Sequence, residues 1–226
     1  MKAIQIRTYG GNEIVEINND APLPQLVAGK VLVQVHAAGV NPVDGKIRQG
    51  FFQQMIPLTF PATLGGDFSG VVLDVGEGVT SVKEGDEIYG QASVLAGGSG
   101  SFAEVAMGDA TMLALKPSRL SAVEAAALPL SGVSAWQALV EQINLSRGQT
   151  ILIHGGAGGI GSMAIQIAKH MGATVATTAS TRDVDFVKSL GADIVIDYKT
   201  QRFEELVRDA DAVFDTVGGE TLTRSF

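Results

Sequence analysis

The chain contains no cysteine, although it has 226 residues. It therefore has no disulfide framework, no thiolate nucleophile and no zinc site built from sulfur ligands. Basic residues are also few, with 16 Lys and Arg against 24 Asp and Glu and a formal net charge of −8. A protein that binds nucleic acid needs a basic surface. We therefore expect no nucleic-acid partner.

Long apolar runs are absent as well. A membrane-spanning helix needs about 18 or more consecutive apolar residues, and the sequence has no such run. The N-terminal residues, MKAIQIRTYGG, alternate polar with apolar side chains, whereas a secretory signal peptide needs an unbroken apolar stretch. These absences predict a cytoplasmic protein with no membrane partner.

Apolar residues and glycine, by contrast, are abundant, at 46% of the chain and 28 residues. The apolar fraction is sufficient for a buried core and excludes global disorder. Residues 1–120 are predicted to form short strands separated by glycine-containing turns. Val31, Val33 and Val35, for example, would share one face of a strand. Several such strands predict a small β-barrel-like domain.

The pattern becomes helical near residue 120. Ser121 and Glu124 fit a capping box, and Pro129 is expected to limit that helix. A second helix is predicted over residues 133–142. From residue 150, predicted strands (150–154, 175–178, 194–196 and 212–214) alternate with predicted helices (160–171, 183–190 and 203–208). This alternation predicts an α/β fold with a parallel, doubly wound sheet over residues 121–226.

A glycine-rich loop follows the first of these strands and opens the next helix. It fits the pattern G-x-G-x-x-G and consists of Gly156, Ala157, Gly158, Gly159, Ile160 and Gly161. In this setting the first glycine permits a tight turn, the second lets the backbone approach a pyrophosphate, and the third lets helix and strand pack closely. The helix N-terminus offers free N–H groups to the phosphates. The loop therefore predicts dinucleotide binding, and the alternative is an ordinary glycine-rich turn.

The end of the second strand bears on which dinucleotide binds. NAD sites usually place Asp or Glu there, on the ribose hydroxyls, but here the strand is followed by Ser180, Thr181 and Arg182. Hydroxyls and a guanidinium suit a 2′-phosphate, because Arg binds phosphate through a charged fork. The alternative is that Arg182 is a solvated residue of the first helical turn, and Asp183 follows it directly. We favour NADPH over NADH.

Four further stretches are distinctive when they are taken together: residues 38–44 (AGVNPVD), 65–72 (GGDFSGVV), 82–90 (VKEGDEIYG) and 127–139 (ALPLSGVSAWQAL). With the glycine loop, they resemble the zinc-free quinone oxidoreductases, the zeta-crystallin-like branch of the medium-chain dehydrogenase/reductase superfamily. The resemblance implies a GroES-like domain over residues 1–120 and an NADP-binding Rossmann domain over residues 121–226.

The resemblance also bears on metal binding. Zinc-dependent members of that superfamily carry a catalytic cysteine at the position of Asn41 and a His-Glu pair at the positions of Gly66 and Asp67. The chain's histidines are scattered and are interpreted as structural or solvated: His36, His154 and His170. We therefore expect no bound metal. Without a metal, hydride transfer needs an acceptor that delocalises the developing negative charge, such as a quinone or an enone.

The resemblance implies three groups of residues at the cofactor. Asn41 and Ser134 would lie near the nicotinamide, and Ser180, Arg182 and Tyr198 near the adenosine phosphate. The loop at residues 215–218, which contains Val217, would also face the cofactor.

No catalytic residue is assigned, and Asn41 and Lys46 are weak candidates. Many quinone reductases have Tyr at the place of Lys46. Lys46 could orient or protonate an enolate, although a surface lysine is the commoner case. Asp44 and Asp67 could form a carboxylate pair, but they are equally well explained as buried structural hydrogen-bond acceptors. Neither is assigned a catalytic role. Delivery of the proton from water would need no catalytic side chain at all.

Three functions remain open at this point. The first is a zinc-independent oxidoreductase that transfers a hydride from NADPH to a quinone or to an activated C=C bond, as in an enone or alkenal. The second is an NADPH-binding structural or redox-sensing protein with little turnover. The third is an enoyl reductase of lipid or polyketide synthesis, which shares the fold and the cofactor.

The length of the chain is small for this organisation. A complete Rossmann sheet has six strands, whereas the pattern contains four. We expect the sequence to be part of a longer chain, and the resemblance implies a homodimer for the full-length protein.

Overall fold

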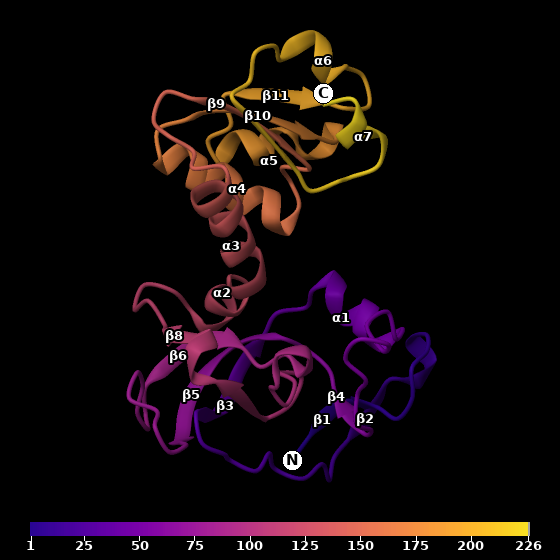
Figure 1. The fold of residues 1–226 in the computed structure, drawn as a ribbon, viewed down its shortest axis with the longest axis vertical. Helices are drawn as coiled ribbons and strands as arrows, with labels where there is room; N and C mark the ends of the chain where they lie inside the picture. Colours follow the sequence, from indigo (N-terminus) through magenta and orange to yellow (C-terminus); the bar gives the residue numbers. More distant parts are fainter. Residues whose placement is uncertain (226) are drawn as a thin grey trace. The chain divides into compact units, whose positions relative to one another are not determined.

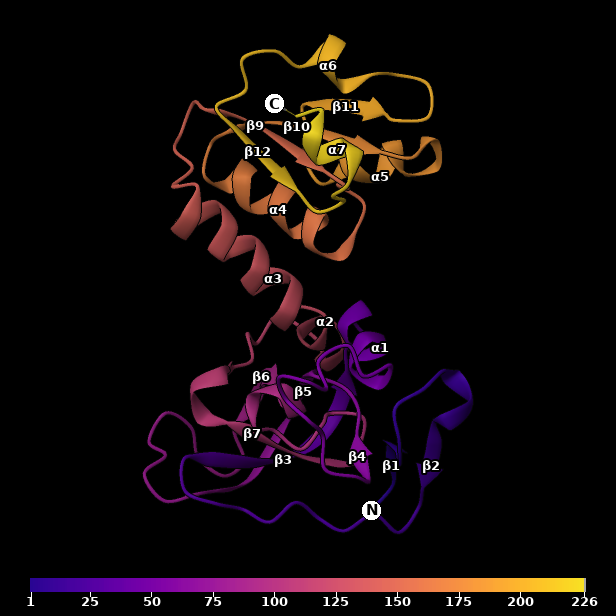
Figure 2. The same ribbon diagram turned by 45° about the vertical axis from the view of Figure 1, so that its right-hand side comes forward.

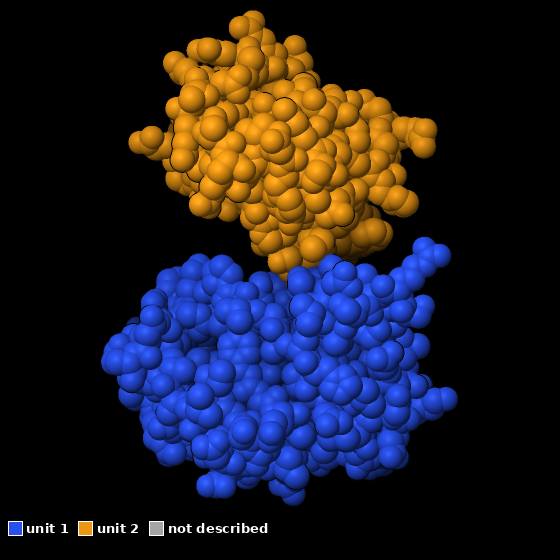
Figure 3. All heavy atoms as spheres, turned by 180° about the vertical axis from the view of Figure 1, so that it is seen from behind, with its two compact units in different colours: residues 1–130 blue, residues 131–226 orange. Residues whose placement is uncertain are grey.

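The computed structural model describes residues 1–225, and its two compact units divide the chain after Leu130 (Figure 3). This division lies beyond residue 120, where the sequence pattern changes. The reason is that helix α2 (Ala122–Ala126) packs on strands β3 (Lys30–Ala38) and β5 (Asp67–Val75) of the first unit. Helix α2 begins with the predicted capping box of Ser121 and Glu124.

The first unit contains two antiparallel sheets (Figure 1). The larger has the strand order β7-β3-β5-β6-β8 and the smaller the order β2-β1-β4. The remaining strands are β1 (Ala3–Ile6), β2 (Glu16–Asn18), β4 (Ala62–Thr63), β6 (Glu87–Gln91), β7 (Val105–Asp109) and β8 (Leu113–Leu115). The predicted alternation in β3 is confirmed, because Val31 and Val33 are buried while Gln34 is exposed. Helix α1 (Pro42–Arg48) follows β3.

Helix α3 (Pro129–Trp136) begins earlier than the sequence predicts and continues into a π-helical segment, Gln137–Gln142. Helix α2 ends before Pro129, as the sequence predicts, and Pro129 also opens α3. The first turn of a helix tolerates proline, since its N–H groups have no partner within the helix.

The second unit, which begins at Ser131, is built on a parallel sheet with the strand order β11-β10-β9-β12 (Figure 2). Its strands are β9 (Thr150–His154), β10 (Thr174–Ala179), β11 (Ile194–Asp197) and β12 (Ala212–Asp215), and its remaining helices are α4 (Gly159–His170), α5 (Val184–Ser189), α6 (Phe203–Leu206) and α7 (Glu220–Thr223). This order matches the first four strands of a Rossmann sheet. The predicted parallel α/β arrangement is confirmed.

Helices cover both faces of this sheet, which explains why its strands are apolar almost throughout. On one face, Ile151 and Ile153 of β9 pack with Ala164 and Ile165 of α4. On the other face, Leu152 packs in a cluster that includes Phe203 of α6. Of the helix face predicted for α4, Ala164 and Ala168 are fully buried, whereas Met163, Ile167 and Met171 are half-buried.

Candidate functional site

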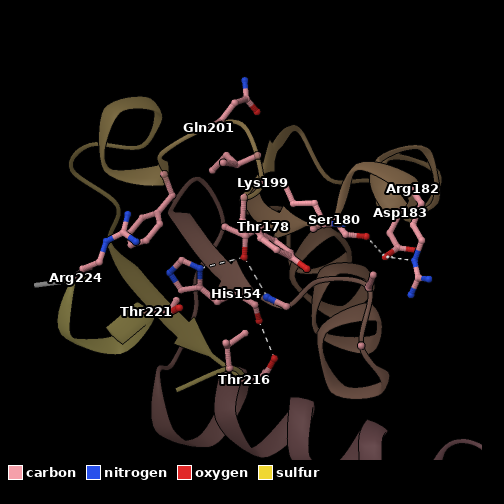
Figure 4. Close-up of a pocket in the computed structure, with 18 residues that line it drawn as sticks. His154, Thr178, Ser180, Arg182, Asp183, Lys199, Gln201, Thr216, Thr221 and Arg224 are labelled. Carbon is pink, nitrogen blue, oxygen red and sulfur yellow. Dashed lines mark hydrogen bonds and ion pairs between the residues drawn. The ribbon is translucent and has the colours of Figure 1, made fainter. Parts of the chain in front are cut away.

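A pocket of about 910 Å³ lies in the second unit, at the carboxyl ends of its strands (Figure 4). Residues at the ends of β9, β10 and β11 and residues that follow β12 line it, together with Thr221 of α7 and Arg224. Ligands of open α/β sheets bind outside the carboxyl ends of the strands. The topology therefore places this pocket where a ligand is expected.

The glycine loop folds between β9 and α4. Gly155, one residue before the predicted motif, has φ +74° and makes the tight turn that was expected at Gly156. Gly156 is required for space instead, because a Cβ atom there would overlap the Thr177 hydroxyl. A Cβ atom at Gly161 would overlap the carbonyl oxygen of Gly155. Gly161 thus lets α4 approach the loop closely, as the sequence predicts.

At the second motif glycine, Gly158, no such overlap within the protein requires glycine. It is exposed, and a Cβ atom there would meet only the Gly155 carbonyl oxygen, at 3.3 Å. Gly158 is also the N-cap of α4, and no side chain of the described residues caps that helix. The N-terminus of α4 therefore has unused N–H groups beside a glycine that leaves room for a ligand. Both features fit a pyrophosphate.

Ser180, Arg182 and Asp183 lie at one end of the pocket (Figure 4). The Ser180 hydroxyl donates a hydrogen bond to Asp183 at 2.5 Å. This bond, with further support from Arg182, holds the pKa of Asp183 below its ordinary value. The Arg182 side chain is 88% exposed, and its guanidinium lies 3.5 Å from the Asp183 carboxylate. Arg182 is therefore free to turn toward an anion.

The neighbouring strand end contributes Tyr198 and Lys199, which are both exposed and line the same pocket. The exposed Thr181 lies beside them but not in the lining, and its hydroxyl donates to Asp197 at 2.7 Å. That bond is the main reason why the pKa of Asp197 lies below its ordinary value. Val217 lines the pocket from the loop after β12. Asp215 shapes that loop by accepting from the N–H groups of Val217 and Gly218.

Thr216, in the loop that the resemblance places at the cofactor, lines the pocket, whereas several other lining residues are absent from the sequence predictions: Thr178, Lys199, Gln201, Thr221 and Arg224. Thr178 and Lys199 lie near the carboxyl ends of β10 and β11, where a ligand is expected, but that rule alone does not select them from the neighbouring residues. His154, interpreted from sequence as structural or solvated, is fully buried and also lines the pocket. The remaining motif residues, Gly159 and Ile160, begin α4 and do not line the pocket.

The candidates Asn41, Lys46 and Ser134 lie outside this pocket. Ser134 is half-buried in α3. Asn41 precedes α1, and its side chain donates to Asp67 at 2.9 Å. Lys46 is exposed, with its ammonium group 5.7 Å from the centre of the Phe51 ring.

The acidic pair near Asn41 is buried and engaged in hydrogen bonds. Asp67 accepts from Gln91 at 2.8 Å, from Asn41 and from the Leu130 N–H at 3.0 Å. Asp44 accepts from the Asn41 N–H at 2.7 Å, and burial raises the pKa of Asp44. Among residues 1–225, no three His, Cys, Asp or Glu side chains gather where they could hold a metal ion. The donors present therefore do not fit a zinc site.

Comparison with protein families is consistent with this geometry. Residues 27–118 match the alcohol dehydrogenase GroES-like domain, and residues 159–226 match the zinc-binding dehydrogenases. A chloroplast envelope quinone oxidoreductase homolog of Arabidopsis thaliana is 36% identical over 222 residues, which cover 96% of this chain and 67% of that protein. The chain belongs to the quinone oxidoreductase branch of the medium-chain dehydrogenase/reductase superfamily.

Other relatives in this family are more similar but longer. A 2-methylene-furan-3-one reductase of Solanum lycopersicum is 44% identical over 225 residues, which cover 96% of this chain and 57% of that protein. An NADPH-dependent alkenal/one oxidoreductase of the Arabidopsis thaliana chloroplast is 43% identical over 225 residues, which cover 96% of this chain and 58% of that protein. The chain thus spans somewhat more than half the length of these two relatives.

Solved structures of family members have the same fold. The quinone oxidoreductase of Coxiella burnetii superposes with a TM-score of 0.89 at 38% identity, over 100% of this chain and 71% of that chain. The Escherichia coli quinone oxidoreductase complexed with NADPH superposes with a TM-score of 0.86 at 28% identity, over 100% of this chain and 69% of that chain.

The expected cytoplasmic localisation is wrong. Relatives in the family are named for the chloroplast or its envelope, as the two Arabidopsis thaliana proteins are. A missing secretory signal does not separate the cytoplasm from organelles, because transit peptides follow a different pattern. Among the described residues, no helix has both the length and the apolar character needed to cross a membrane.

Proposed function

We propose that the chain binds NADPH in the pocket of the second unit and transfers a hydride from it to a quinone or to the activated C=C bond of an enone or alkenal. One observation carries the proposal: the uncapped N-terminus of α4 and the exposed Gly158 share a pocket with the basic groups of Arg182 and Lys199. A pyrophosphate and a 2′-phosphate would each find a partner there. The names of the alkenal and quinone oxidoreductases among the relatives support the acceptor class.

Different residues of the pocket would bind different parts of NADPH. The backbone of the glycine loop would hold the pyrophosphate, Arg182 and Lys199 would pair with the 2′-phosphate, and Tyr198 would flank the adenosine. When bound, NADPH supplies the hydride. The chain's own part is to orient the dinucleotide and to exclude water from it, which fixes the reacting geometry.

The acceptor must also take up a proton. An enone gains a hydride at its β-carbon and a proton on the resulting enolate, and a quinone gains a hydride and a proton to give a hydroquinone. Lys46 is exposed and is a candidate proton donor, and water is the alternative. Because a delocalised enolate or hydroquinone anion needs no Lewis acid, the reaction is compatible with a chain whose donors do not fit zinc. A metal-free enzyme and a homodimer stay predictions.

An acceptor screen tests this proposal. NADPH binding is measured by its fluorescence, and NADPH oxidation by its absorbance, with a benzoquinone, a 2-alkenal and a long-chain enoyl thioester as acceptors. We expect tight binding and turnover with the quinone or the alkenal. Turnover with the thioester alone would favour an enoyl reductase. Tight binding without turnover on any acceptor would favour a structural or redox-sensing role and overturn the enzymatic proposal.

A further inference from the structure

His154 is the last residue of β9 and directly precedes the turn at Gly155. Its side chain is fully buried, whereas His36 and His170 are exposed. A buried imidazole needs hydrogen-bond partners for both ring nitrogens, because an unpaired polar atom in the interior is costly. Nδ1 lies 3.1 Å from the Thr178 hydroxyl in the pocket lining (Figure 4). Nε2 lies 3.1 Å from the hydroxyl of Ser225, which directly follows the lining residue Arg224.

The direction of these bonds follows from the neighbours of His154. The Ser225 hydroxyl donates to the Thr221 carbonyl at 2.8 Å, so toward His154 Nε2, 3.1 Å away, it can only accept. Nε2 therefore carries the proton. In a neutral ring the other nitrogen, Nδ1, is then an acceptor, and the Thr178 hydroxyl at 3.1 Å donates to it.

Thr178 extends this chain of bonds to the glycine loop. Its hydroxyl oxygen accepts from the Gly155 N–H at 3.2 Å. The His154 carbonyl is also fixed, because the Thr216 hydroxyl donates to it at 2.7 Å. One imidazole thus connects the turn before the glycine loop with the segment at α7. We call the hydrogen bonds that run from Gly155 through Thr178, His154 and Ser225 to Thr221 the His154 hydrogen-bond network.

Protonation of the imidazole would disrupt the His154 hydrogen-bond network at the bond between Nδ1 and the Thr178 hydroxyl. A charged imidazole donates from both nitrogens, so Nδ1–H would face the proton of Thr178. Thr178 would have to turn its own proton away from the ring. The buried Thr178 hydroxyl oxygen would then accept from both the Gly155 N–H and the imidazole, and its own proton would need a new acceptor. The hydroxyl that accepts from the Gly155 N–H would therefore have to reorient, which would disturb the start of the glycine loop.

The groups around His154 oppose that charge on balance. Burial is the main cause that lowers its pKa. Asp215 of β12 and Glu204 of α6 favour the charged ring, whereas Arg224 opposes it. Glu204 is already paired with Arg224, whose guanidinium lies 5.1 Å from the Phe203 ring. Phe203 in turn packs edge-on against the imidazole at 4.5 Å.

We propose that His154 is a positioning residue for the dinucleotide: as the neutral Nε2–H form it holds the turn at Gly155 and the segment at α7 in the arrangement that binds NADPH. The inference rests on the proposed function for the identity of the ligand. It makes NADPH affinity sensitive to pH through a buried residue of the pocket lining.

Two substitutions and one control test this role on the full chain. His154→Gln keeps a donor and an acceptor but cannot titrate near neutral pH, and His154→Phe removes both hydrogen bonds. His170→Gln changes an exposed histidine of α4 outside the pocket. The dissociation constant of NADPH is measured for each from pH 7.5 to pH 5.5, with circular dichroism as a check on folding.

We expect His154→Phe to weaken NADPH binding about tenfold at pH 7.5, as the loss of a buried hydrogen-bonded partner implies. His154→Gln should bind within a few-fold of the wild type at pH 7.5 and lose less affinity on acidification. His170→Gln should follow the wild-type pH profile. An unchanged pH profile in His154→Gln would overturn the role. If His154→Phe does not fold, the pH profile of His154→Gln decides the outcome alone.

Nitrogen-15 NMR of the ligand-free chain tests the hydrogen bonds separately. The chain has three histidines, and the signal lost in His154→Gln assigns the buried one. We expect the neutral Nε2–H form at pH 7. The Nδ1–H form or a charged ring at pH 7 would overturn the inference. If the wild type binds no NADPH, the proposed function fails, while the NMR result still decides the state of His154.

Discussion

At the scale of single residues, opposite charges meet where the 2′-phosphate would bind. Arg182 and Asp183 both line the pocket and lie 3.5 Å apart. Ser180 stabilises the ionised form of Asp183 through the hydrogen bond that lowers its pKa. A phosphate would therefore gain a partner in Arg182 and also face a like charge in Asp183. The two contributions can be separated by substitution.

Substitution Arg182→Ala should weaken NADPH binding about tenfold and NADH binding less than about twofold, since only NADPH carries the 2′-phosphate and a hydrogen bond to a charged group contributes roughly 1.5–3 kcal/mol. Fluorescence titration with both cofactors measures this. Arg208→Ala, at an exposed arginine outside the pocket lining, is the matched control. Equal losses for the two cofactors would contradict the assignment of Arg182.

Substitution Asp183→Asn should have the opposite effect on NADPH. Removing a like charge near the 2′-phosphate should tighten NADPH binding by a few-fold, because exposed charge pairs contribute up to about 1 kcal/mol. NADH binding should change little. Asp185→Asn, an exposed acid outside the pocket, is the control. If Asp183→Asn instead weakens NADH selectively, Asp183 binds the ribose hydroxyls and the pocket prefers NADH.

Local sequence predicted only part of this residue-scale picture. Ser180 and Arg182 could be found because they follow a strand that is next to the glycine loop in the fold. Thr178 and His154 could not be identified as site residues from the sequence, because the role of a buried hydroxyl or imidazole depends on partners from other strands. Lys199 was missed although it is adjacent to Tyr198, since an exposed lysine has no distinctive local pattern.

At the scale of elements, the junction of β9 and α4 gives two glycines different tasks. Gly161 lies in the first turn of α4, where a Cβ atom would overlap the Gly155 carbonyl, whereas Gly158 is exposed with φ −76°. The helix and the strand can therefore pack closely only with glycine at 161. At Gly158 a Cβ atom would make one tight contact, with the Gly155 carbonyl oxygen at 3.3 Å, so alanine there needs a far smaller adjustment of the protein than at Gly161.

The substitutions Gly161→Ala and Gly158→Ala should accordingly separate folding from binding. Gly161→Ala should lower the free energy of unfolding by about 1–3 kcal/mol, as overpacking does. Gly158→Ala should lower that free energy by less than about 1 kcal/mol, because glycine is the better N-cap and the Gly155 carbonyl lies close. It should still weaken NADPH binding several-fold, because its methyl group would occupy space beside the pyrophosphate. Urea unfolding and NADPH titration measure the two effects. Unchanged NADPH affinity in Gly158→Ala would place the pyrophosphate elsewhere.

Elements were the level at which sequence was most informative. The second-unit strands could be predicted to within one residue at each end, because apolar runs bounded by turns have few alternative structures. The start of α3 and the buried face of α4 are harder to predict from the sequence. In α4 both Met163 and Ile165 are apolar, and only packing on the sheet decides that Ile165 is the fully buried one.

At the scale of the whole molecule, net charge and site charge have opposite signs. The formal charge of −8 repels an anionic dinucleotide at long range, whereas Arg182, Lys199 and Arg224 line the pocket itself. Screening by salt at physiological strength limits the repulsion to about 8 Å. Contacts inside the pocket should therefore dominate affinity, which the composition alone could not indicate.

Ligand-linked stability should be largest where the ligand binds. The apolar clusters each lie within one unit, and the proposed NADPH site lies wholly in the second. At a free NADPH concentration 100 times its dissociation constant, the second unit should gain about 2.7 kcal/mol of stability. The chain's one tryptophan, Trp136, belongs to that unit and is half exposed, so its fluorescence should report the shift in urea unfolding.

Hydrogen exchange of β9 and β10 provides an independent measurement of the same gain, since the slowest amides exchange through unfolding of their core. With saturating NADPH these amides should slow by roughly the 100-fold that the concentration ratio implies. The slowing of amide exchange by NADPH should be smaller in Arg182→Ala at equal NADPH concentration and unchanged in Arg208→Ala. Because the pocket opens at the carboxyl ends of these two strands, unchanged exchange in both would mean that NADPH does not bind the second unit.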